Sequence, residues 1–119
     1  MSFVGIDIIE VARIDTAIQR WGDRFLKRIY TNNELELYRN DIPALAAHFA
    51  GKEAVMKALG TGTKGISWRE IEILANNAGK PIIRLNGKAR NKAYELKLVD
   101  FDISLSDIKD FAIAAVIAN

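Results

Sequence analysis

Residues 45–59 read LAAHFAGKEAVMKAL, and the ten apolar residues among these fifteen surround the axis of the helix that they predict. A helix that is apolar on all sides is usually buried. Pro43 begins the helix and Gly60 provides its C-terminal stop. Glu53 and Lys57 stand four residues apart and therefore share one face. The sequence predicts a buried helix that carries two charged groups.

On either side of this helix, the sequence predicts strands and further helices. Thr31 and Glu34 form a capping box that opens a short helix. We expect strands over 3–9, 70–75, 81–85, 101–105 and 111–118, and helices over 15–29 (bent at Gly22), 31–38, 43–59 and 86–98. This order predicts an α+β fold in which a largely antiparallel sheet packs against the long central helix. We expect a single domain over residues 1–119.

The composition of the 119 residues excludes several classes of protein. The absence of cysteine excludes disulfides, thiolate metal sites and a cysteine nucleophile. His48 is the only histidine, which excludes a multi-histidine metal site, and we expect it on a helix surface. A net charge of +2 argues against nucleic acid as a partner. No apolar run is long enough for a membrane span, and the first residues lack a signal-peptide pattern, so we expect a soluble, cytoplasmic protein with no membrane partner.

Two acidic residues stand in apolar surroundings. Asp7 interrupts a strand of isoleucines, where an unpaired carboxylate costs on the order of several kcal/mol. It needs a cation, hydrogen-bond donors or water, unless it lies on a solvated sheet face or caps a turn. Glu53 with Lys57 is either a functional pair or a simple ion pair of roughly 0.2–0.5 kcal/mol. Gly51 in the same helix costs nearly 1 kcal/mol relative to alanine, which suggests close approach of another backbone or a ligand.

The loop after the buried helix reads GTGTKG over residues 60–65. Small residues at this place leave backbone N–H groups that can cradle a phosphate, and Lys64 can add positive charge. The alternative is a simple C-terminal helix cap. We keep both interpretations open from the residues alone.

Five basic residues follow the first strand, and most of them would share a face if the helix continues through Gly22. They are Arg13, Arg20, Arg24, Lys27 and Arg28. Such a face is either simply solvated or docks an acidic partner. Complementary charge would speed encounter and make binding sensitive to salt.

Several motifs together resemble a known family. Residues 5–14, GIDIIEVARI, fit the pattern G-x-D-I-x-x-x-x-R-I, and residues 48–62, HFAGKEAVMKALGTG, fit F-x-x-K-E-A-x-x-K-A-x-G-T-G. Further matches are WREIEI (68–73), GKP (79–81) and the segment DISLSD…DFAIAAVI (102–117). In this order they resemble the holo-acyl-carrier-protein synthases over essentially the whole chain.

The resemblance implies a 4′-phosphopantetheinyl transferase fold and activity. Family members move phosphopantetheine from coenzyme A to a serine of apo acyl carrier protein and release adenosine 3′,5′-bisphosphate. They require Mg²⁺, serve fatty acid biosynthesis, and are typically homotrimers with active sites between subunits. We expect the same substrates, metal and assembly here.

The resemblance also implies roles for individual residues. Asp7 and Glu53 match the metal ligands, and hard carboxylate oxygens suit Mg²⁺. Lys57 would contact phosphate, so the implied catalytic residues are Asp7, Glu53 and Lys57, with Glu53 as the candidate base. The implied coenzyme A contacts are Lys57, Gly60, Thr61, Gly62, Lys64 and Ser106. The acidic helix of acyl carrier protein would dock on Arg13, Arg20, Arg24, Lys27 and Arg28.

One position departs from the family pattern. Asp107 stands where the family carries a histidine near coenzyme A, and an acid facing a phosphate would repel it. Either Asp107 points away, or another residue such as His48 substitutes, or coenzyme A binds differently. The alternatives to a transferase are a catalytically impaired module that binds acyl carrier protein, and another Mg²⁺-dependent phosphoryl or nucleotidyl enzyme. The apolar strand 111–118 is either central or covered by a neighbouring subunit.

Overall fold

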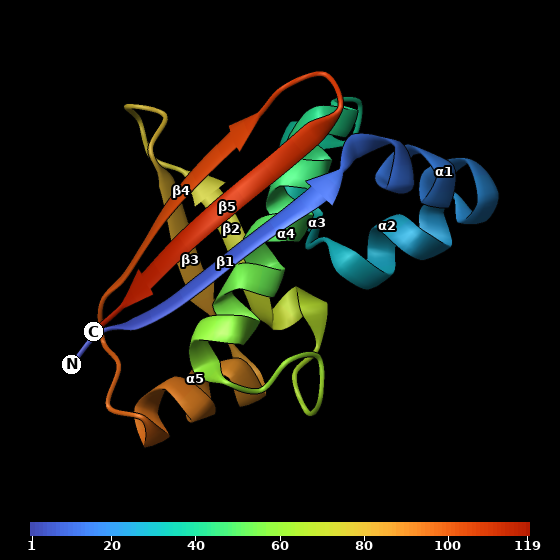
Figure 1. Ribbon diagram of the computed structural model, residues 1–119. Coiled ribbons are helices and arrows are strands. Elements are labelled where there is room, and N and C mark those ends of the chain that lie inside the picture. Colours follow the sequence, from blue (N-terminus) through green and yellow to red (C-terminus); the bar gives the residue numbers. More distant parts are fainter.

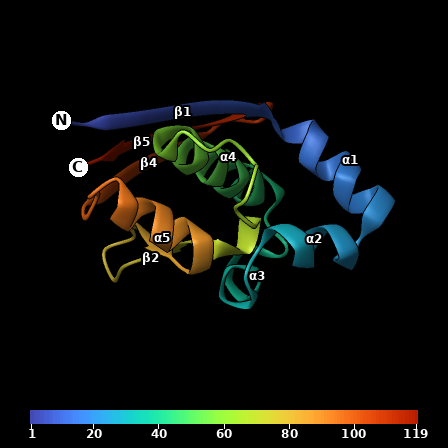
Figure 2. The same ribbon diagram turned by 90° about the horizontal axis from the view of Figure 1, so that it is seen from below.

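The computed structural model describes residues 1–119 and arranges them in three layers (Figures 1 and 2). A three-stranded sheet of order β1-β5-β4 forms one layer, and a two-stranded sheet of β2 and β3 lies on the far side of helix α4. The strands are β1 (Phe3–Glu10), β2 (Ile71–Ala75), β3 (Pro81–Leu85), β4 (Phe101–Asp107) and β5 (Phe111–Ala118). The helices are α1 (Val11–Trp21), α2 (Asp23–Ile29), α3 (Asn32–Tyr38), α4 (Ile42–Leu59) and α5 (Gly87–Glu95), with a 3-10 turn at Trp68–Glu70. Both sheets are antiparallel, so the predicted α+β class is confirmed.

The largest difference from the expected elements lies in the first helical segment. The helix expected over 15–29 starts earlier, at Val11, and is interrupted at Gly22, so that α1 and α2 are separate. Gly22 has φ 57° and ψ −135°, a conformation that favours glycine and ends the helical hydrogen-bond pattern. At the other end of the chain, α5 ends at Glu95 and not at residue 98, whereas β4 continues to Asp107.

Strand β1 pairs with β5 along its whole length, from Phe3 opposite Ala118 to Glu10 opposite Phe111. This register turns Asp7 toward α4 and leaves the alternate residues on the outer face of the sheet. Val4, Ile6 and Ile8 on that outer face are 64%, 56% and 62% exposed. On β5, the outer face adds Ile113 and Ile117, both exposed as well. We call these five side chains the outer apolar face.

Helix α4 is buried on all sides, as its sequence predicts. It contributes twelve of its eighteen residues to the buried set, and the 27 buried apolar residues of the chain form one cluster. No helix combines the length and the apolar character that a membrane span requires.

Two glycines, Gly51 on α4 and Gly5 on β1, lie where the helix packs closely against the sheets, and their neighbours differ. A Cβ atom on Gly51 would lie 2.7 Å from Cδ1 of Ile73 and 3.1 Å from Cδ1 of Ile103. The expected close approach is therefore to side chains of both sheets, and the predicted backbone or ligand is not what Gly51 contacts. A backbone does come close at Gly5 on β1, where a Cβ atom would lie 1.8 Å from the carbonyl oxygen of Ala54. Gly5 thus allows β1 to lie directly on α4.

An ion pair that sequence reasoning missed lies in the core. The capping box at Thr31 is confirmed, and its Glu34 also accepts a hydrogen bond from Nζ of Lys52 at 2.7 Å. Both charged side chains are completely buried. The ammonium group of Lys52 donates further bonds to the carbonyl oxygens of Trp68 (3.2 Å) and Ile71. The signal available in the sequence was the lysine next to Glu53 inside an otherwise apolar helix.

His48 is buried, at 6% exposure, so the expected surface position is wrong. Its ring lies against that of Tyr38, with centroids 4.3 Å apart, and Nδ1 lies 2.8 Å from the carbonyl oxygen of Ala44. Burial lowers the pKa of the imidazole below its ordinary value, an effect opposed by the bond to Ala44 and the charge of Glu34, while the charge of Lys52 lowers it further. The histidine is therefore part of the packing between α3 and α4.

The lowered pKa of His48 predicts a loss of stability in mild acid. In the unfolded chain the imidazole takes up a proton near pH 6.5, whereas in the folded chain it does so only at lower pH. The free energy of unfolding is therefore highest above pH 6.5, and below that pH it falls by at most about 1.4 kcal/mol per pH unit. Glu53, whose pKa is raised, acts in the opposite direction between pH 4.5 and 7. We therefore compare wild type with His48→Phe, which keeps the ring against Tyr38. Melting temperatures from pH 8 to pH 5 should fall more steeply for wild type; parallel curves would contradict the assignment.

Candidate active site

The structure brings Asp7 and Glu53 to one cavity of about 200 Å³. Asp7 reaches it from the inner face of β1, and Glu53 from the side of α4 that faces the start of α1. Burial, the charge of Asp7 and a hydrogen bond with Asp7 raise the pKa of Glu53 to about 7, while Lys57 and Arg13 lower it. The side chain of Asp7 is only 10% exposed, so it does not lie on a solvated sheet face. Two acids far apart in sequence thus form one close pair.

Lys57 pairs with the strand and not with its neighbour on the helix. Its Nζ lies 3.0 Å from Oδ1 of Asp7 and 3.0 Å from the carbonyl oxygen of Ile6. The simple ion pair of Lys57 with Glu53 that the spacing allowed is therefore not formed. The side chain of Lys57 remains 54% exposed, which leaves its ammonium group open to a ligand at the mouth of the site.

The acid pair is the full set of metal-ligating side chains that the site offers. No group of three or more histidine, cysteine, aspartate or glutamate side chains in the chain could hold a metal ion. Two carboxylates are nonetheless enough for Mg²⁺, which is commonly held by one or two carboxylates together with phosphate oxygens and water. A divalent cation held by this pair would take its remaining ligands from phosphate oxygens and water.

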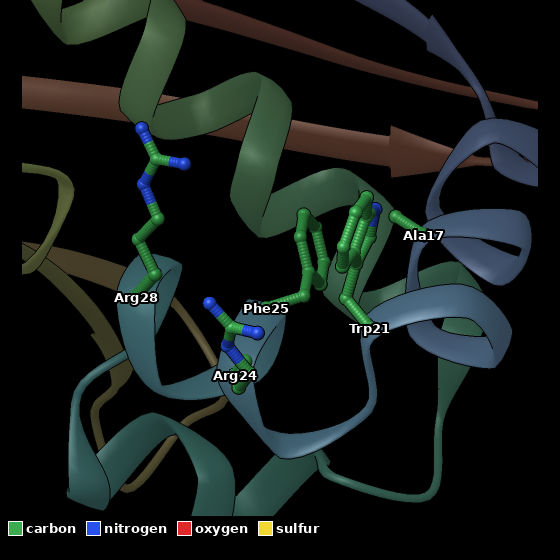
Figure 3. A pocket seen from close by; sticks show the side chains of 5 residues that line it. All are labelled: Ala17, Trp21, Arg24, Phe25 and Arg28. Atoms are coloured by element: carbon green, nitrogen blue, oxygen red, sulfur yellow. The ribbon is translucent and has the colours of Figure 1, made fainter.

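Arg13 also lines the acid cavity, together with Ala17 and Phe25. Ala17 and Phe25 continue into a second, neighbouring cavity of about 340 Å³ on α1 and α2, shown with its lining side chains in Figure 3. Its other lining residues are Trp21, Arg24 and Arg28. We call the two cavities together the α1–α2 groove. One end of this groove is the acid pair and the other end is basic and aromatic.

The predicted single basic face is wrong in its geometry, because the helix does not continue through Gly22. Arg24, Lys27 and Arg28 share one side of α2 by their spacing of three and four residues. Arg20 lies apart from them on α1, with its guanidinium carbon 5.1 Å from the centre of the Trp21 ring. The break nevertheless turns α2 so that Arg24 and Arg28 line the groove that Arg13 enters from the other end.

The loop after α4 is a helix cap. Gly60 takes the left-handed conformation (φ 73°), and its N–H donates to the carbonyl oxygens of Lys57 and Met56. The N–H of Thr61 also donates to Met56, at 3.2 Å. These two N–H groups are therefore already bonded, and the N–H of Lys64 donates to the carbonyl oxygen of Thr61 at 3.4 Å. The N–H of Gly62 and the ammonium group of Lys64 are left to meet a phosphate. None of these residues lines the acid cavity.

Ser106 and Asp107 lie away from the acid pair of the same chain. Ser106 is opposite Ile113 on β5, which is opposite Ile8 on β1, so all three point to the outer face of the sheet. Ser106 and Asp107 line a separate cavity of about 250 Å³ together with Ile8 and Phe111. His48 does not line the acid cavity either. Within one chain, neither Asp107 nor His48 therefore lines the cavity that holds Asp7 and Glu53.

Comparison with known proteins agrees with this fold. Residues 3–116 match the family model described as the 4′-phosphopantetheinyl transferase superfamily. Holo-[acyl-carrier-protein] synthase of Herpetosiphon aurantiacus is 44% identical over 98% of each chain, and that of Dehalococcoides mccartyi is 48% identical over 100% of this chain and 99% of its own. The crystal structure of the Helicobacter pylori synthase in complex with coenzyme A has a TM-score of 0.89 at 32% identity, covering 98% of this chain and 99% of the other.

The chain belongs to the 4′-phosphopantetheinyl transferase superfamily. Within it, the relatives that resemble the chain over its full length are holo-[acyl-carrier-protein] synthases. The chain is accordingly an enzyme, a phosphopantetheinyl transferase, and the resemblance seen in the sequence is confirmed.

Proposed function

We propose that this enzyme transfers 4′-phosphopantetheine from coenzyme A to a serine of apo acyl carrier protein, with Mg²⁺, and releases adenosine 3′,5′-bisphosphate. The observation that carries the proposal is the pairing of Asp7 with Glu53 in one cavity at the end of an arginine-lined groove. Coenzyme A as co-substrate is supported by the complexes of similar synthases from Helicobacter pylori and Bacillus anthracis with coenzyme A. A cytoplasmic role in fatty acid biosynthesis rests on the family resemblance.

The residues present fit Mg²⁺. Asp7 and Glu53 supply two hard oxygen ligands. Burial, together with the negative charge of Asp7, raises the pKa of Glu53, and a divalent cation would relieve the repulsion between the two carboxylates. When bound there, Mg²⁺ would neutralise charge on the pyrophosphate of coenzyme A. Asp7 and Glu53 would hold it, with the remaining ligands supplied by the substrate and water.

The chain's own residues would also bind coenzyme A and take up the proton of the serine hydroxyl. Lys57, half exposed beside Asp7, would contact a phosphate oxygen of coenzyme A as a point charge. Gly62 and Lys64 on the exposed loop would lie along the bound nucleotide or pantetheine arm. Glu53 is the candidate base for the serine hydroxyl proton. The serine oxygen would then attack the phosphorus of the pantetheine phosphate, and the bond to the departing nucleotide would break.

We propose that acyl carrier protein docks on the α1–α2 groove. Arg24 and Arg28 would meet acidic side chains, while Trp21 and Phe25 provide an apolar surface between them. Arg20 and Lys27 would add charge at the edge of this surface, and Arg13 would lie next to the reacting serine. Because one end of the groove is the acid cavity, a carrier helix lying along the groove would present its serine to Asp7 and Glu53. The binding should weaken as salt is added.

We propose a homotrimer in which the outer apolar face is covered by neighbouring subunits. Five large apolar side chains exposed on one sheet face are typical of an interface. Ser106 points to this same face, so in a trimer it could approach the acid pair of a neighbour, as the family resemblance implies. The number of subunits comes from the resemblance.

Replacing Ile6 by lysine should dissociate the trimer. A charge at the centre of a covered apolar face would have to be desolvated without a partner, which costs several kcal/mol. Light scattering of Ile6→Lys should give the mass of one chain, with a matching loss of activity. The control is Ile82→Lys, an exposed isoleucine on β3, which should leave the mass unchanged. A wild-type protein that is a monomer at assay concentration and fully active would contradict the proposal.

The transferase activity is tested by mass spectrometry of apo acyl carrier protein after incubation with the enzyme, coenzyme A and Mg²⁺. We expect the carrier protein to gain one phosphopantetheine group, and EDTA to prevent the gain. A carrier protein whose acceptor serine is replaced by alanine is the control. Tight binding of several carrier proteins without transfer, beside a working control enzyme, would favour the binding module instead.

A further inference from the structure

Helix α4 carries Glu53, and the rotation of this helix decides whether Glu53 lies opposite Asp7. The helix is buried on all sides, and many of its buried residues are alanines. Apolar burial is itself non-directional, so hydrogen bonds and ion pairs act together with the close packing at Gly5 and Gly51 to select one rotation of the helix. Directional contacts therefore help to hold Glu53 at its place opposite Asp7.

Lys52 makes the most directional contacts of α4 with the rest of the chain. Its ammonium group has three hydrogens, and its three acceptors are Glu34 (Oε1, 2.7 Å), the carbonyl oxygen of Trp68 (3.2 Å) and that of Ile71. The side chain is completely buried. Lys52 therefore has no bond left for a substrate, unlike Lys57 at the mouth of the acid cavity.

The carboxylate of Glu34, which accepts the hydrogen bond from Lys52, also accepts hydrogen bonds from the backbone. Oε1 of Glu34 accepts a bond from the N–H of Thr31 at 2.8 Å, and Oε2 accepts one from the N–H of Ile73 at 2.9 Å. The first of these belongs to the start of α3 and the second to β2. Lys52 thus anchors α4 to the main chain of two other elements.

We propose that Lys52 is a positioning residue whose buried ion pair with Glu34 sets the rotation of α4 and so holds Glu53 against Asp7. Successive helix residues point about 100° apart, so that Lys52 reaches the β2 side of α4 while Glu53 reaches the β1 and α1 side. A buried ion pair adds little stability compared with apolar side chains, but it can specify one arrangement among several. The inference rests on the proposed function, since Glu53 is its target.

The test replaces the ion pair without leaving an isolated charge. We compare wild type with the double variant Lys52→Met/Glu34→Gln, titrating Mn²⁺ into the protein with coenzyme A and following free Mn²⁺ by electron paramagnetic resonance. We expect the folded double variant to bind Mn²⁺ about 10- to 100-fold more weakly, with a comparable fall in kcat. The KM for acyl carrier protein should stay unchanged, because Trp21, Arg24 and Arg28 at the basic end of the α1–α2 groove are not among the bonding partners of Lys52.

The control is Val55→Ala, which also weakens the packing of α4 but removes no directional contact. It should lower the melting temperature while Mn²⁺ affinity and kcat stay at the wild-type values. A folded double variant with wild-type Mn²⁺ affinity and kcat would overturn the inference and leave the proposed function standing. If the double variant does not fold, Glu34→Asp is measured instead, because it keeps the charge opposite Lys52 but shortens the side chain that accepts its hydrogen bond. We expect Mn²⁺ affinity and kcat to fall about tenfold, and unchanged values would overturn the inference. A wild type that neither binds Mn²⁺ nor transfers the group would overturn the proposed function first.

Discussion

Glu53→Gln is expected to lower turnover by about a thousandfold, and Asp7→Asn by a similar factor. Each substitution removes one negative ligand from the site proposed for Mg²⁺. Charge stabilisation by a metal contributes several kcal/mol, and each 1.36 kcal/mol is a factor of ten in rate. Single-turnover transfer to apo acyl carrier protein measures the effect, and a Mg²⁺ titration should show that part of the loss is weaker metal binding.

The fold should survive both substitutions, because each new amide has nearly the size of the carboxylate it replaces. In Asp7→Asn the ion pair with Lys57 is lost, which costs only about 0–1 kcal/mol since the lysine is half exposed. Glu36→Gln, on the exposed side of α3, is the matched control and should keep wild-type turnover. Near-wild-type turnover in Glu53→Gln or Asp7→Asn would remove that residue from the metal site.

Gly5→Ala is expected to have the largest effect on stability. The new methyl group would lie 1.8 Å from the carbonyl oxygen of Ala54 and 3.0 Å from the amide nitrogen of Ala58, both in the backbone of α4. Overpacking commonly costs about 1–3 kcal/mol, and occasionally more when the obstacle cannot move. A helix backbone held between two sheets cannot move aside, so we expect at least about 3 kcal/mol. Urea unfolding followed by circular dichroism measures it.

The matched control for this change is Gly60→Ala. Gly60 has space around it but a left-handed backbone, so its replacement should cost only about 1–2 kcal/mol. A loss in Gly5→Ala no larger than that in Gly60→Ala would mean that β1 can move away from α4. Turnover of the folded fraction of Gly5→Ala should also fall, since such a movement carries Asp7 with it.

Local sequence patterns predicted those helices and strands well whose structure depends on residues close in the sequence. The apolar run of α4, the alternation in β1 and the capping box at Thr31 all depend on neighbours within a few residues, and all three are confirmed. The complete break of the helix at Gly22 was harder to predict from the sequence. The apolar spacing continues through this residue, and only its backbone conformation separates α1 from α2.

Contacts between elements were harder to predict for a physical reason. The pairing of Lys57 with Asp7, rather than with Glu53, depends on how closely β1 lies on α4, and this distance is set by Gly5. The ion pair of Lys52 with Glu34 joins two helices whose relative placement no local pattern contains. The acid pair itself was expected from the family motifs, and the residues alone left it open.

The pairing of β1 with β5 also has a consequence for folding. Strand β1 is synthesised long before its only partner strand, β5, which starts at Phe111, so the three-stranded sheet forms late. Until then α4 lacks one of its two covering layers, and the apolar side chains of the nascent β1 are exposed to water. Contacts between such distant segments slow folding and favour aggregation of incomplete chains. Chaperone association during translation should therefore persist until nearly the whole chain has left the exit tunnel.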